Sequence, residues 1–182
     1  MFDLDQFLAD CVAARADSSP HGAIGEVLRG ACTRPGQVLD VLPPERAGIT
    51  TLHRSDDLTV LHVVWGPKMA LRPHDHRMWA AIGICSGGED NTFFRREGTT
   101  IAATGVRELR PRDVILLGDD TIHSVVNPTS SLAGAIHVYA GDFFAVPRSE
   151  WNPDTLEEQP YDVQATLAHF ERQNALLDAG VC

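Results

Sequence analysis

The spacing of apolar residues changes along the chain. Between residues 4 and 31 apolar residues recur every three or four positions, as they do on one face of a helix. These positions are Leu4, Phe7, Leu8, Cys11 and Val12, followed by Ile24, Val27, Leu28 and Ala31. Asp3 can cap the first helix, Pro20 precedes the second, and Pro35 with Gly36 is expected to end it. The pattern predicts two helices before residue 48.

From about residue 48, short runs rich in Val, Ile, Thr and aromatic residues alternate with Gly, Pro and Asn turns. The predicted strands are 58–65, 78–85, 91–96, 99–103, 113–117, 121–126 and 133–140. Many short strands at this spacing indicate an antiparallel sandwich or barrel. Residues 149–163 contain five acids and no base, which predicts a solvated loop. A last helix is expected from Asp162, with Val163, Leu167, Phe170 and Leu177 facing inward.

These elements predict one mainly β domain over residues 1–182. Its helical N-terminal segment is 1–47, its β-barrel is 48–148, and a loop with the C-terminal helix occupies 149–182. A length of 182 residues suits a single domain.

Charge and cysteine usage limit the partners and the compartment. The net charge is −10, which disfavours nucleic acid and anionic membranes as partners. Four cysteines form no CxxC pair, as is typical of a reducing cytoplasm. The first residues lack the basic region and apolar run of a signal peptide, and no run approaches the ~20 apolar residues of a membrane span. We expect a cytoplasmic protein, with the oligomeric state left open.

The main chemical signal is a group of histidines. His74 and His76 are two positions apart, and side chains at i and i+2 of a strand point to one face about 7 Å apart. Two imidazoles placed in this way can bind one metal ion. His123, within the predicted strand 121–126, is the best candidate for a third ligand.

The spacing of these histidines resembles the two cupin motifs, but the glutamate that the resemblance implies at positions 79–81 is absent. Three neutral histidines leave the charge of a divalent metal uncompensated. Such a site favours an anionic ligand such as a thiolate, because coordination lowers the pKa of a thiol. It also leaves up to three positions for a bidentate substrate and O2.

The sequence resembles the thiol dioxygenase branch of the cupins, which is related to cysteine dioxygenase, and is most similar to the bacterial 3-mercaptopropionate dioxygenase type. The segments that support the resemblance are Val64–Pro67, Pro73–Gly83, His123–Asn127, Ile136–Tyr139 and Val146–Arg148. The resemblance implies a cupin double-stranded β-helix and one Fe(II) per chain, bound by His74, His76 and His123. It also implies an enzyme that adds both atoms of O2 to a thiol and forms a sulfinic acid.

Three further residues have counterparts in this family. His137 and Tyr139 match the last two members of its Ser–His–Tyr triad, whereas Ala135 stands at the serine position. Strand alternation places all three on one face. The resemblance implies that Arg148 binds the substrate carboxylate. No arginine occupies 48–50, where cysteine dioxygenases have theirs, so cysteine is a poor candidate substrate, and Ala81 replaces the cross-linked cysteine of the mammalian type.

Two alternatives remain at this stage. A three-histidine iron site also suits a cupin dioxygenase that acts on a non-thiol chelate such as a β-diketone. A metal-bound sensor or binding module without turnover would have the same ligands. Products from a panel of thiols and chelating substrates distinguish the three hypotheses.

Overall fold

The computed structural model describes residues 1–181. Within these residues it contains four helices and eleven strands. The helices are α1 (Leu4–Arg15), α2 (Pro20–Cys32), α3 (Pro35–Leu39) and α4 (Val163–Asp178). The strands are β1 (Gly48–Arg54), β2 (Thr59–Trp65), β3 (Ala70–Asp75), β4 (Ala80–Ile84), β5 (Glu89–Glu97), β6 (Thr100–Leu109), β7 (Val114–Leu117), β8 (Ile122–Val126), β9 (Ala133–Tyr139), β10 (Ser149–Trp151) and β11 (Glu158–Pro160). No described helix is long and apolar enough to cross a bilayer.

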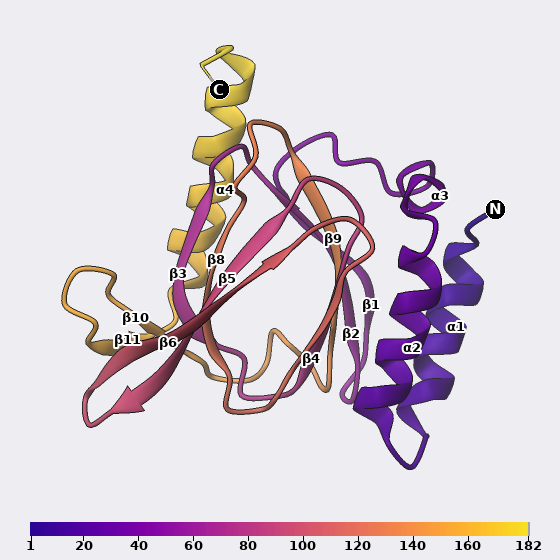
Figure 1. The fold of residues 1–182 in the computed structure, drawn as a ribbon, viewed down its shortest axis with the longest axis horizontal. Coiled ribbons are helices and arrows are strands. Elements are labelled where there is room, and N and C mark those ends of the chain that lie inside the picture. Colours follow the sequence, from indigo (N-terminus) through magenta and orange to yellow (C-terminus); the bar gives the residue numbers. More distant parts are fainter. Residues whose placement is uncertain (182) are drawn as a thin grey trace.

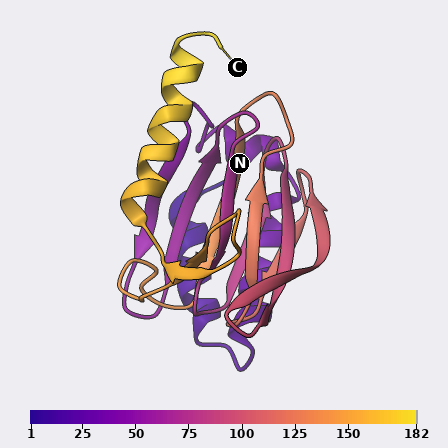
Figure 2. The same ribbon diagram turned by 90° about the vertical axis from the view of Figure 1, so that its left-hand side faces the viewer.

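The strands form two antiparallel sheets that face each other across one core. Their orders are β1-β2-β9-β4-β7 and β11-β10-β3-β8-β5-β6. Figure 1 shows the strands surrounding a central space, with α1 and α2 outside the first sheet and α4 beside β3. Figure 2 gives the view from the side, with α4 along the left edge of the molecule. The predicted antiparallel barrel is therefore present.

The central strands of the first sheet are buried on both faces. Leu61 and Val63 of β2 point into the barrel, whereas Val60 lies in the core beneath the N-terminal helices with Val138 of β9. Every residue of β2 and β9 is buried as a result. A Cβ atom at Gly83 would lie 2.6 Å from the Cys32 sulfur, so glycine permits the close approach of α2 to β4.

The N-terminal segment contains one helix more than the pattern predicts. Asp3 caps α1 as expected, since its carboxylate accepts a hydrogen bond of 3.1 Å from the Gln6 amide. Pro35 does not simply end the preceding helix, because it occupies the first turn of α3. Proline is favoured there because its missing N–H needs no partner in the first turn and its φ is already helical.

Residues 149–163 are only in part the solvated loop that their acidity suggests, since residues 153–155 are exposed but the segment also contains two short strands. The first of these strands, β10, pairs with β3 and with β11. Glu150 and Trp151 are both 0% exposed; Glu150 pairs with Arg72 and Trp151 packs against Ile101. The acidic composition was misleading because the partners of these side chains are distant in sequence.

The buried face of α4 also differs from the prediction. Val163 and Leu167 are 46% and 45% exposed, whereas Thr166, Phe170 and Asn174 are buried. The Asn174 amide exchanges hydrogen bonds of 2.9 Å with both backbone groups of Ala47. This pair of bonds orients the helix with a polar residue inward, which a search for apolar periodicity does not detect.

Candidate metal centre

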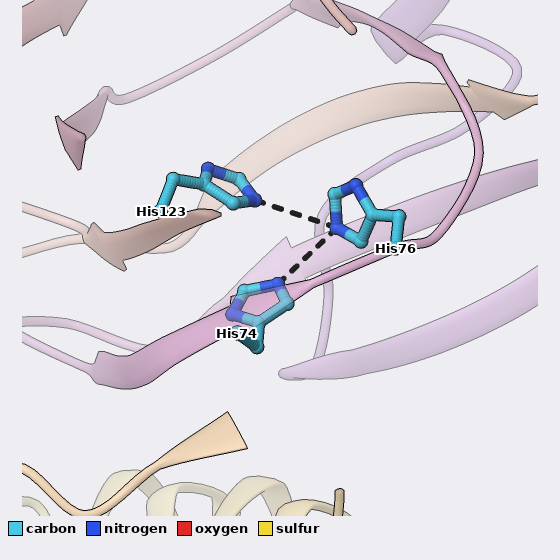
Figure 3. Close-up of side chains that lie close together, drawn as sticks. All are labelled: His74, His76 and His123. Carbon is cyan, nitrogen blue, oxygen red and sulfur yellow. Dashed lines mark hydrogen bonds between the residues drawn. The ribbon is translucent and has the colours of Figure 1, made fainter. Parts of the chain in front are cut away.

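Three histidines from two neighbouring strands converge inside the barrel (Figure 3). His74 of β3 is paired in register with His123 of β8, and His76 follows the last residue of β3. The Nε2 atom of His76 lies 3.2 Å from that of His74 and 3.4 Å from that of His123. The predicted grouping is present, although of His74 and His76 only His74 lies within a strand, because β3 ends at Asp75 and His76 is the first residue after it.

The nitrogen spacing fits a shared metal ion. Two nitrogens each about 2.1 Å from one metal lie about 3.0 Å apart at a right angle and about 3.4 Å apart at the tetrahedral angle. The observed separations of 3.2 and 3.4 Å fall within this range. His74, His76 and His123 therefore form a group that could bind a metal ion.

Burial keeps the three imidazoles neutral. Each is 4% exposed or less. Burial lowers the pKa of His74 to about 4 and lowers the pKa values of His76 and His123 well below the ordinary value. A neutral imidazole has one nitrogen lone pair, which is the form that coordinates metals.

Hydrogen bonds to the opposite ring nitrogens orient two of these lone pairs. The Nδ1 atom of His74 lies 3.0 Å from the carbonyl oxygen of Arg72, and that of His123 lies 2.6 Å from Oδ1 of Asn91. Both partners are oxygens that only accept, so Nδ1 must donate in each ring. Nε2 is then free to bind metal in His74 and His123, an arrangement typical of metal-binding histidines.

His137 and Tyr139 lie on the barrel face of β9, two residues apart. The Nδ1 atom of His137 lies 3.0 Å from the Tyr139 hydroxyl, and the Tyr139 ring centre lies 5.0 Å from that of His76. Burial raises the pKa of Tyr139, so the phenol stays protonated. Ala135, on the same strand, adds no hydroxyl to this pair.

Glu89, which the sequence analysis did not identify, supplies the second polar neighbour of His137. Its side chain is 1% exposed, and its Oε2 atom lies 3.4 Å from Nε2 of His137. Oε2 also accepts a hydrogen bond of 2.9 Å from the Trp65 indole, and Oε1 accepts one of 3.1 Å from the Asn91 amide. The available signal was the alternation of Glu89 and Asn91 in β5, which places two polar residues on the same strand face as Phe93.

Arg148, in the segment between β9 and β10, lies on an aromatic surface beside the histidines. Its guanidinium carbon is 3.8 Å from the ring centre of Phe143 and 4.5 Å from that of Tyr161. The Tyr161 ring is 5.8 Å from that of His74. Within residues 1–181 no carboxylate pairs with Arg148, and its buried Nη1 atom has no hydrogen-bond partner. Burial lowers its pKa, but a guanidinium stays charged.

Asp75 ties the segment that contains Arg148 to the metal-binding strand. Asp75 lies between His74 and His76 in the sequence. Its carboxylate is buried and accepts a hydrogen bond of 2.8 Å from the Ser149 amide. It also pairs with Arg77 at 2.6 Å. The position of Arg148 is thereby linked to that of His74 and His76.

A cavity of about 30 Å³ lies among these groups. The histidine cluster, His137 and Tyr139 line it together with aromatic and aliphatic side chains. This volume exceeds the ~10–15 Å³ that one water needs but is far smaller than an ordinary ligand pocket. The interior therefore suits a metal ion with small ligands.

Comparison with solved structures shows which proteins the chain is similar to. No family model matches the chain. A protein from Bacillus halodurans has a TM-score of 0.51 and 18% identity, over 57% of this chain and 77% of that one. A cupin family protein with a double-stranded β-helix from Methanocaldococcus jannaschii has a TM-score of 0.44 and 12% identity, over 53% of this chain and 82% of that one. A double-stranded β-helix protein from Klebsiella pneumoniae has a TM-score of 0.45 and 14% identity, over 58% of this chain and 80% of that one. The chain has a mainly β fold of two facing antiparallel sheets, and the structures that it is similar to include cupin and double-stranded β-helix proteins.

Proposed function

We propose that the protein is an Fe(II)-dependent dioxygenase that converts a small carboxylate-bearing thiol, similar to 3-mercaptopropionate, to its sulfinic acid. The observation that supports this most directly is a half-buried Arg148, whose buried Nη1 atom has no hydrogen-bond partner, beside three neutral histidines. The histidines provide no negative charge, so both a divalent metal and the arginine need anions from a ligand. A thiol with a carboxylate supplies two, one for each.

The three Nε2 atoms of His74, His76 and His123 would hold the iron, which when bound supplies adjacent coordination positions for a thiolate and O2. The net reaction uses one thiol and one O2, and both oxygen atoms end in the sulfinic acid. No external reductant is therefore needed. Holding the reactants side by side replaces a random encounter with an intramolecular step.

Arg148 would orient the other end of the substrate. A guanidinium binds a carboxylate through two parallel charge-assisted hydrogen bonds. Phe143 and Tyr161 hold its plane by stacking, which leaves its edge for a ligand. The cavity of about 30 Å³ favours a substrate with a short chain between thiol and carboxylate.

Tyr139 would act on the reacting atoms. Its hydroxyl lies in the lining of the same cavity and is held by His137 at 3.0 Å. This contact holds the hydroxyl in place, and the phenol would act as the donor toward the substrate or oxygen. A preorganised donor in a water-poor pocket is worth more than it is in bulk solvent.

A substrate panel tests the proposal. Purified protein is loaded with iron, its metal content is measured, and uptake of isotopically labelled O2 is recorded with 3-mercaptopropionate, cysteine, 2-mercaptoethanol and a β-diketone. We expect the fastest uptake with 3-mercaptopropionate and a sulfinate that contains two labelled oxygens. Turnover of the β-diketone alone would favour a non-thiol dioxygenase, and bound metal without any uptake would favour a sensor or binding module.

A further inference from the structure

We propose that Glu89 is the positioning residue of this site, with one carboxylate oxygen acting on a metal ligand and the other on the Tyr139 hydroxyl. The inference rests on the metal centre and the Tyr139 role of the proposed function. It assigns a role to a residue that lies outside both the histidine cluster and the His137–Tyr139 pair.

Three groups converge on the Glu89 side chain. The Trp65 indole and the Asn91 amide donate to it at 2.9 and 3.1 Å, and Nε2 of His137 lies 3.4 Å away. Burial opposes ionisation, yet His137, Asn91 and Trp65 together hold the pKa of Glu89 below its usual value. The carboxylate is ionised and can only accept hydrogen bonds.

One chain of hydrogen bonds runs from Oε1 to the metal centre. Because Oε1 accepts, Asn91 must turn its amide nitrogen toward Glu89 and its oxygen toward His123. Nδ1 of His123 must then donate to that oxygen, and Nε2 is left with the lone pair that faces His76. Glu89 therefore determines, through one amide, that His123 presents a ligand atom to the centre.

The other carboxylate oxygen acts on the tyrosine. The Oε2 atom faces Nε2 of His137, whose Nδ1 contacts the Tyr139 hydroxyl. Nε2 of His137 is buried without a hydrogen-bond partner, and Oε2 lies 3.4 Å from it, so a small approach lets Oε2 accept the hydrogen of Nε2 and leaves Nδ1 to share a proton with Tyr139. The carboxylate thus takes the orienting role that Ala135 has no hydroxyl to perform.

The substitution Glu89→Gln separates the hydrogen-bond chain to the metal centre from the one to Tyr139. The Trp65 indole can only donate, so the new side chain must keep its oxygen on the Trp65 and His137 side and turn its amide nitrogen toward Asn91. The amide nitrogens at positions 89 and 91 then face each other. Because both can only donate, the Asn91 amide must invert. Its nitrogen then faces Nδ1 of His123, and the hydrogen of that ring moves to Nε2, where it blocks coordination.

A second substitution reverses this effect. In E89Q/N91D, the carboxylate at position 91 accepts from the new amide and also from Nδ1 of His123. Nε2 of His123 is freed again, and the total charge of the pocket is unchanged. The double variant restores the hydrogen bonds that free Nε2 of His123, but through a different set of atoms. If E89Q lost metal only through a packing defect, the second substitution would not recover it.

The experiment measures Co(II) and Zn(II) affinity of the full chain by competition with a chelator, with folding checked by circular dichroism and thermal unfolding. We expect E89Q to bind metal ~10–100-fold more weakly than the wild type, and E89Q/N91D to recover most of that loss. The matched control is Glu150→Gln, which neutralises another fully buried carboxylate whose partners are Arg72 and Gln159. It should lower the melting temperature without changing metal affinity.

The outcomes separate this inference from the proposed function. Equal metal affinity of E89Q and the wild type, or a double variant that binds no better than E89Q, would overturn the inference. If E89Q does not fold, Asn91→Ala tests the same chain, and unchanged affinity in that variant would overturn it equally. Metal binding without any thiol turnover would refute the proposed function and leave the Glu89 result valid.

Discussion

The two sides of the pocket are held by different kinds of interaction. On the first, which we call the histidine side (His74, His76, His123, His137 and Tyr139), hydrogen bonds orient the rings: His74 and His123 donate to buried oxygens, and His137 is bonded to the Tyr139 hydroxyl. On the second, the arginine side (Arg148 with Phe143 and Tyr161), a cation is held by the faces of two aromatic rings. The buried Nη1 atom of Arg148 has no hydrogen-bond partner and remains available to a ligand.

This difference indicates which part of the reaction each side serves. Directional bonds preorganise groups whose angle to a metal or a reacting atom must be exact to a fraction of an ångström. Stacking fixes the plane of a guanidinium and leaves its edge exposed to an anion. The histidine side thus suits chemistry and the arginine side suits recognition. We therefore expect variants on the histidine side to lose metal binding or turnover, and variants on the arginine side to lose affinity for a carboxylate-bearing substrate.

The largest effect is expected on the histidine side, from His76→Ala. Removing one of three ligands should weaken metal binding by more than the ~10–100-fold that an outer partner costs. Elemental analysis measures the metal, and circular dichroism measures folding. His62→Ala is the matched control, because it removes another buried histidine that is not part of the cluster. Near-stoichiometric metal in the His76 variant would contradict the three-histidine assignment.

Tyr139→Phe should give the next largest effect. It deletes one hydroxyl and leaves the ring against Phe143, so metal content and folding should be unchanged. Turnover at saturating thiol and O2 should fall ~10–1000-fold, the range for losing one oxygen-directed donor or general acid. An unchanged rate would show that Tyr139 is a packing residue.

Arg148→Ala tests the arginine side and should separate two substrates. Losing a paired charged contact costs about 1.5–3 kcal/mol, which is ~10–100-fold in affinity. The half-saturating concentration of 3-mercaptopropionate should rise by that factor, whereas that of 2-mercaptoethanol, which has no carboxylate, should hardly change. Arg172→Ala, an exposed arginine on α4, is the control. Equal losses for both thiols would mean that Arg148 supports the structure.

The residues of the two sides also differ in how far the sequence predicts them. His74, His76 and His123 were predicted because their spacing in two segments is a chemical pattern. His137 and Tyr139 were predicted from the family resemblance, and strand alternation places them on one face. Glu89 and Asn91 were missed because their contacts depend on the pairing of β5 with β8. Tyr161 was missed because its segment was interpreted as solvated loop. A local pattern predicts the ligands, but the groups that orient them come from strand pairing.

The smallest effect is expected from Ala135→Ser, which introduces the hydroxyl that the family resemblance places there. If Glu89 already orients His137, a second acceptor is redundant, and kcat/KM should stay within about threefold of the wild type, less than 1 kcal/mol of barrier. The variant should lose some stability, since a buried hydroxyl without a partner costs about 1–3 kcal/mol. In the Glu89→Gln background the same serine should leave metal affinity low, because it lies beside His137 and cannot correct the Asn91 amide. A large gain in wild-type turnover from Ala135→Ser would show that His137 lacks an effective partner and that the carboxylate at 3.4 Å does not orient it.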